Sequence, residues 1–97
     1  MEENDIQKTV ELLSALGEFN RLSLVYRLCE CEAPQNAMCL CECCNVDASV
    51  ASRHLKTLTQ AGILELSKKG RERIYSLDKA HVAKELRSLA TKIETSI

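Results

Sequence analysis

Several features that define other protein classes are missing from this 97-residue sequence. No apolar run approaches the roughly 20 residues that a membrane-spanning helix needs. The first residues, MEENDIQK, are acidic and include no apolar segment, so we expect no secretory signal peptide and a cytoplasmic protein. The sequence also lacks internal repeats, linkers and low-complexity tracts, and we expect one domain over residues 1–97.

Residue patterns that carry catalysis are also scarce. The sequence has two histidines, His54 and His81, and no glycine-rich loop of the kind that binds phosphate. No nucleophile and base form a convincing pair, and no motif for metal-assisted hydrolysis is present. We therefore do not expect an enzyme.

Net charge is almost absent, but the charges that exist are unevenly distributed. The formal net charge is −1. Residues 1–51 carry a net charge of −6, whereas residues 52–75 carry six basic and two acidic side chains, a net of +4. A basic region in a nearly neutral chain is typical of a surface that binds phosphate, although a solvated charged face has the same composition.

Apolar spacing predicts two helices in the first third of the chain, over residues 5–16 and 20–29. Gly17 can end the first helix, and Asn20 is a candidate N-cap of the second. The only proline, Pro34, is expected in a loop that includes residues 35 and 36. The first helix has an apolar stripe at i, i+4 and i+7, formed by Ile6, Val10 and Leu13.

In the middle of the chain the spacing of apolar residues first indicates helices and then a β-hairpin. A short helix is expected over residues 37–44, a turn over 45–47, and a longer helix over 48–61 between a cap at Asp47 and a stop at Gly62. Residues 63–77 alternate apolar and polar side chains around Lys69-Gly70, which predicts a β-hairpin.

A last helix is expected from Asp78 or Lys79 onward. Its apolar residues repeat at intervals of four, three and four, a heptad-like stripe formed by Val82, Leu86, Leu89 and Ile93. The predicted fold is mostly α with a β-hairpin, in the order α-α-α-α-β-β-α.

The predicted helix over residues 48–61 has two contrasting faces. One face is apolar with a histidine in it, and we expect that His54 is a hydrogen-bonded structural residue on the core side. The other face is short, polar and basic, and arginine on such a face commonly reads guanine in a major groove. It consists of Ser49, Ser52, Arg53 and Lys56.

The predicted hairpin is basic near its tip, which suits a wing that lies on the DNA backbone or in a minor groove. Its basic residues are Lys68, Lys69, Arg71 and Arg73. A short helix, a tight turn, a helix with a basic face and a basic hairpin together predict a winged helix-turn-helix that binds double-stranded DNA. The alternative is an amphipathic surface helix and a charged hairpin without a role in DNA binding.

All six cysteines lie within residues 29–44. Disulfides among them would close only very small loops, and in a reducing cytosol such a cluster is typical of a metal site or a redox switch. On a short helix, Cys39 and Cys43 are spaced i, i+4, and Cys41 and Cys44 are spaced i, i+3, so each pair shares a face. Cys29 continues an apolar stripe and is expected in the core; Cys44 could equally be a core residue.

Three segments resemble the ArsR/SmtB family of bacterial metal-sensing repressors: ALGEFNRLSLVYRL, VDASVASRHLKTLTQAGIL and KKGRERIYSL. The similarity extends from about Val10 to Ile93. The resemblance implies a winged-helix homodimer whose first and last helices form the interface, in agreement with the two apolar stripes. It also implies binding to a palindromic operator and release of DNA when an inducer binds.

Inducer sites in this family differ, and two types can be compared with this chain. One uses Asp and His between the last helices; Asp78 and His81 are present, but residues 91, 92, 94 and 95 include no histidine, so we do not expect this site. The other places cysteines around the third helix in a pattern like ELCVCDL, and AMCLCECCNV is similar but shifted. The ligand set that the resemblance favours is Cys31, Cys43 and Cys44, with Cys39, Cys41 and Cys29 as further candidates.

Thiolates select soft or thiophilic ions. Arsenite and antimonite bind three thiolates, whereas zinc and cadmium take four ligands. We expect As(III) or Sb(III) as the inducer of a repressor, with cadmium, lead or zinc as alternatives. Three rival interpretations remain: a thiol redox sensor on the same fold, a structural zinc site, and a metal-buffering protein without a DNA function.

Overall fold

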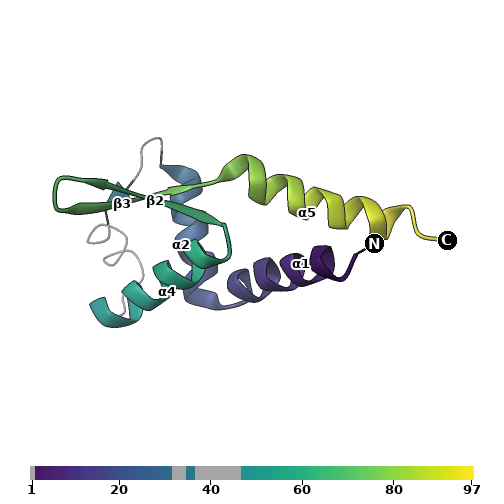
Figure 1. Cartoon of the computed structure of the whole chain (residues 1–97), viewed down its shortest axis with the longest axis horizontal. Helices are drawn as coiled ribbons and strands as arrows, with labels where there is room; N and C mark the ends of the chain where they lie inside the picture. The colour runs from purple at the N-terminus through teal and green to yellow at the C-terminus, as the bar shows by residue number, and fades with distance from the viewer. Residues whose placement is uncertain (1, 32–34, 37–46) are drawn as a thin grey trace.

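The computed structural model describes residues 2–31, 35–36 and 47–97, which form helices and one small sheet (Figure 1). The predicted short helix over residues 37–44 lies outside the described residues. None of the described helices is both long enough and apolar enough to cross a membrane. The elements are α1 (Glu3–Leu16), α2 (Phe19–Glu30), β1 (Gln35–Asn36), α4 (Ala48–Gln60), β2 (Leu64–Lys69), β3 (Glu72–Leu77) and α5 (Lys79–Glu94).

The other four predicted helices are present, with small differences at their ends. Helix α1 begins at Glu3, two residues before the predicted start. Helix α2 begins at Phe19 because its N-cap is Glu18, whose carboxylate accepts a hydrogen bond from the Arg21 backbone N–H at 2.9 Å. The prediction of Asn20 as the N-cap is therefore wrong: a carboxylate two residues earlier accepts from one of the free N–H groups of the first turn.

The sheet contains one strand more than predicted. Its strand order is β1-β3-β2, and both pairings are antiparallel. The two residues of β1 pair with Ile74 and Tyr75, whereas the sequence predicted a loop there. Two residues are too few to show an alternating pattern. The hairpin turn is Gly70-Arg71, one residue later than predicted, and Gly70 has φ +64°, which a glycine adopts without strain.

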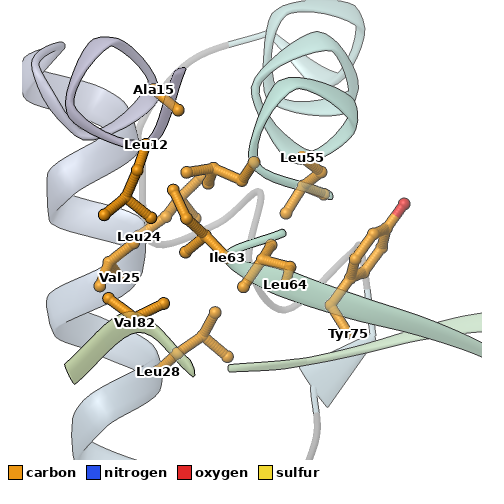
Figure 2. Close-up of a cluster of buried hydrophobic side chains, with 11 residues drawn as sticks. Leu12, Ala15, Leu24, Val25, Leu28, Leu55, Ile63, Leu64, Tyr75 and Val82 are labelled. Carbon is orange, nitrogen blue, oxygen red and sulfur yellow. The ribbon is translucent and has the colours of Figure 1, made fainter. Parts of the chain in front are cut away.

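One apolar cluster lies where α1, α2 and α4 meet the base of the hairpin and the start of α5 (Figure 2). Backbone hydrogen bonds fix this junction: the Ile63 N–H donates to the Leu58 carbonyl, and the Asp78 N–H donates to the Ile63 carbonyl, both at 3.0 Å. The end of α4, the start of β2 and the start of α5 are thereby joined at one residue. The largest fully buried side chains are Leu12, Leu24, Leu55, Leu58 and Ile63.

The molecule is elongated, with principal extents of 49, 24 and 23 Å. Helices α1 and α5 extend from the core toward the same end, where both termini lie, and the hairpin occupies the opposite end (Figure 1). Val82, in the first turn of α5, is the only residue of that helix classed as buried. The apolar side chains farther along α5 are therefore left partly or largely exposed.

We predict that Leu58→Ala lowers the free energy of unfolding by about 2–5 kcal/mol, because it leaves a cavity in a fully buried position. Chemical denaturation at a fixed protein concentration measures the change. The matched control is Leu22→Ala on the outer side of α2, where the leucine is 37% exposed. An equal loss in the two variants would contradict the assignment of Leu58 to the centre of the core.

Candidate nucleic-acid interface

Helix α4 buries one face and exposes the other, as its sequence pattern predicts. Ala51, Leu55 and Leu58 are buried in the apolar core. The four polar or basic residues predicted to read DNA are all exposed: Ser49, Ser52, Arg53 and Lys56. The face that is available to a partner is therefore the short basic one, because burial of the leucines fixes the rotation of the helix.

The hairpin has an apolar base and a basic tip on the same face. The register places Leu64 opposite Leu77, and Leu66 opposite Tyr75. Two residues farther toward the tip, Lys68 lies opposite Arg73 on that same face. Side chains of the hairpin thus change from core-forming to cationic along one face, while the predicted basic residues Lys69 and Arg71 lie at the end of β2 and in the turn.

A hollow joins the exposed face of α4 to this face of the hairpin. Its lining includes Ser52 and Lys56 from α4 and Arg73 from β3. Thr59, Gln60, Leu66 and Tyr75 complete it, and sequence reasoning did not include Thr59 or Gln60. The structure therefore brings together residues that are about 20 positions apart in the sequence, and the hollow has cationic groups on both walls.

The Lys68–Arg73 pair is electrostatically unfavourable in the isolated chain. Like charges directly opposite each other on neighbouring strands destabilise a hairpin. Both side chains are exposed. Next to them, Lys69 lies opposite Glu72, an ordinary pairing of opposite charges. A polyanion lying across the two cations would offset this repulsion.

His54 lies on the core side of α4, as predicted, and its ring is held by polar neighbours. Its side chain is 14% exposed. Arg21 Nη1 is 3.3 Å from His54 Nδ1, and Glu18 Oε2 is 3.8 Å from His54 Nε2. Sequence reasoning missed Arg21, although a cation in the first turn of a helix is unfavourable for the helix dipole and indicates a partner elsewhere.

Two of the six cysteines belong to the described residues. Cys29 is exposed, so its predicted place in the core is wrong: the helix turns this position outward although the residue extends an apolar stripe in sequence. Cys31 ends α2 and is partly buried, and its thiol donates a hydrogen bond to the Arg27 carbonyl at 3.2 Å. Cys39, Cys41, Cys43 and Cys44 lie outside the described residues.

Asp78 and His81 both lie at the start of α5. The Asp78 carboxylate caps α5 and accepts a hydrogen bond from the His81 backbone N–H at 3.2 Å. The His81 side chain is exposed and lies beside Gly62. Within residues 2–31, 35–36 and 47–97, no three His, Cys, Asp or Glu side chains are grouped closely enough to hold a metal ion.

The residues of the two predicted interface stripes are largely accessible. Ile6 and Val10 on α1 are each 50% exposed, and Ile93 on α5 is 64% exposed. Leu13 and Leu86 are also exposed, Leu89 is half-buried, and Val82 is buried at the edge of the core. Three further apolar side chains, which the sequence analysis did not single out, are exposed on α2: Phe19, Leu22 and Tyr26.

No protein-family model matches the sequence, but solved structures do. A possible transcriptional regulator for arsenical resistance is 30% identical, with a TM-score of 0.74, over 89% of this chain and 86% of that chain. An ArsR-like transcriptional regulator from Rhodococcus sp. RHA1 is 27% identical, with a TM-score of 0.76, over 89% and 79% of the two chains.

A homodimeric winged helix-turn-helix DNA-binding domain from Mycobacterium bovis, a possible ArsR-family regulator, shares the fold. It is 18% identical, with a TM-score of 0.72, over 90% of this chain and 82% of that chain. One of the three matched proteins is thus an ArsR-like transcriptional regulator, and the other two are possible transcriptional regulators. From the shared architecture and the 30% identity over most of both chains, we conclude that this protein belongs to the ArsR/SmtB family of winged helix-turn-helix transcriptional regulators.

Proposed function

We propose that this protein is a homodimeric repressor that binds operator DNA and releases it when arsenite or antimonite binds its cysteines. The observation that carries the proposal is the cationic hollow between α4 and the hairpin, with Lys56 and Arg73 on its two walls. A helix inserted into a major groove would place the exposed face of α4 on base edges. The hairpin would then reach the adjacent backbone, where the repulsion between Lys68 and Arg73 is relieved.

We predict that Arg53→Ala and Lys68→Ala weaken DNA binding in different ways. Loss of Arg53 should weaken the binding free energy for operator DNA by about 1–3 kcal/mol and that for random DNA much less, because Arg53 on α4 is proposed to read bases. Loss of Lys68 should weaken binding to operator DNA and to random DNA alike. It should also reduce by about 1 the slope of log affinity against log salt concentration, because Lys68 is proposed to contact phosphate. Fluorescence anisotropy at several salt concentrations, on the DNA upstream of the protein's own coding sequence, measures both effects.

Lys92→Ala is the control for these two variants, since Lys92 lies in the last turn of α5, far from the hairpin (Figure 1). It removes one positive charge and should leave operator affinity unchanged. An equal effect of all three substitutions would indicate a general charge effect and contradict the assigned interface.

The homodimer is supported by the exposed apolar residues of α1 and α5. Beyond Val82, α5 continues for three turns without a buried residue. An isolated helix of this length is marginal in water, so its apolar stripe needs a partner. A second copy related by a two-fold axis would cover both stripes at once, and the matched Mycobacterium bovis domain is itself homodimeric.

We predict that Ile93→Glu weakens dimerisation by more than about tenfold, because a carboxylate is costly to bury in an apolar interface. Analytical ultracentrifugation over a range of concentrations measures the change. Tyr26→Glu is the control, because Tyr26 is as exposed as Ile93 but lies on α2, outside the proposed interface. If the two variants dissociate alike, or if Ile93→Glu remains as dimeric as the wild type, the proposed interface is wrong.

The proposal for the inducer rests on the chemistry and the position of the cysteines. The Cys29 and Cys31 thiols are free at the end of α2, and the other four cysteines precede α4 in the sequence. Thiols fit a thiophilic ion, and three sulfur ligands would satisfy As(III) or Sb(III). An ion bound both to a cysteine at the end of α2 and to cysteines that precede α4 in the sequence would restrain the end of α2 relative to the start of α4. The proposed ligands are Cys31, Cys43 and Cys44.

We predict that arsenite lowers operator affinity by about 5- to 150-fold, the usual range for coupled sites. Cys43→Ser/Cys44→Ser should bind operator normally and ignore arsenite, whereas Cys29→Ser should respond like the wild type. Anisotropy titrations of the reduced protein with arsenite, cadmium, zinc and peroxide test this. A normal response of the double variant would contradict the ligand set, and release by peroxide alone would favour the redox alternative.

A further inference from the structure

One arginine side chain joins three helices of the described structure. From the first turn of α2, Arg21 donates from Nε to the Ala15 carbonyl at 2.7 Å and from Nη2 to the Ser14 carbonyl at 3.4 Å. Both carbonyls lie in the last turn of α1, which has no basic residue of its own. Arg21 Nη1 then reaches His54 Nδ1 on α4 at 3.3 Å.

The chemistry of the two side chains determines the state of the histidine. A guanidinium has only donors, so His54 Nδ1 must accept the hydrogen bond and carry no proton. The proton of the ring is then on Nε2, which faces the Glu18 carboxylate at 3.8 Å. Glu18 in turn accepts from the Arg21 backbone N–H, so the two side chains beside the imidazole come from the N-cap and the first turn of α2.

The helices that Arg21 connects have different parts in the proposed function. Helix α1 carries the apolar residues of the proposed dimer interface, and α4 carries the residues proposed to read DNA. Operator binding by a two-fold dimer requires a set separation and orientation of its two recognition helices. A restraint between the end of α1 and the middle of α4 therefore acts on the geometry that the operator reads.

We infer that Arg21 and His54 are positioning residues, which hold α4 at the angle to α1 that operator DNA requires. The inference rests on the proposed function and adds to it a restraint that touches no DNA. Arg21 and His54 are both partly buried, and His54 lies on the core side of α4. The apolar core sets which face of α4 is exposed and packs the helix against α1, and the arginine contact adds a directional restraint between the two helices.

The hydrogen-bond arrangement has a spectroscopic signature that does not depend on DNA. Long-range nitrogen–proton NMR correlations of the imidazole should show the Nε2–H tautomer for His54 in the wild type at pH 8. Arg21→Gln should alter the His54 pattern and leave that of the exposed His81 unchanged. An Nδ1–H tautomer in the wild type would overturn the proposal.

Three variants separate positioning from stability. His54→Leu removes the acceptor and should weaken operator binding by about tenfold. His54→Asn keeps an acceptor oxygen where Nδ1 was and should stay within about threefold of the wild type. Val25→Ala is the control: it trims a buried core residue one turn along α2 from Arg21, leaves the side chains of Arg21 and His54 in place, and should lower the melting temperature without changing operator affinity.

Anisotropy on the upstream DNA is measured at a temperature where circular dichroism shows every variant folded. Weak binding by His54→Leu, with rescue by His54→Asn, supports the proposal. Equal affinities for the wild type and His54→Leu, or equal losses for Val25→Ala and His54→Leu, would overturn it and leave the proposed function intact. A wild type that binds neither this DNA nor random DNA would instead contradict the proposed function itself.

Discussion

Burial of the leucines of α4 is the interaction on which the rest of the structure depends. Leu55 and Leu58 pack into the cluster shared by α1, α2 and the base of the hairpin. Once they are inside, helical geometry turns Ser52 and Lys56 outward. The same burial places the hairpin, because the chain leaves α4 at Ile63, where backbone hydrogen bonds join α4, β2 and α5. A hydrophobic constraint thus determines where the cationic surface lies.

The second constraint is the small size of the core. A chain of this length buries too little surface to cover two long amphipathic helices on its own. The apolar core accordingly lies between the hairpin at one end and the free ends of α1 and α5 at the other (Figure 1), and the apolar side chains farther along these two helices stay exposed. Binding between two copies therefore would complete the fold and, in the same step, set the separation of two DNA-reading helices. Stability and recognition would then be linked through the proposed dimer interface.

Polar groups at the helix ends restrain the helices through directional contacts, which apolar packing does not provide. Glu18 begins α2, Asp78 begins α5, and Arg21 satisfies the carbonyls at the end of α1. Two of these three capping residues also contact His54, so the start of α2 is connected to the middle of α4. In the sequence five of the six cysteines lie between those same two helices, and Cys29 lies in the last turn of α2. A ligand bound to these cysteines would act on the same pair of helices, α2 and α4, that Arg21 and Glu18 connect through His54.

The sequence by itself determined the order of the helices and the hairpin, the buried stripe of α4 and the exposure of its basic face, because periodicity reports which side of an element is buried. It did not reveal strand β1, whose two residues are too short for a pattern, or the exposure of Cys29, which depends on how α2 is rotated in the core. It also could not bring Ser52 and Lys56 into one hollow with Arg73, or place Arg21 against His54. Those contacts join residues distant in sequence, and only the packing of complete helices and strands decides such distances.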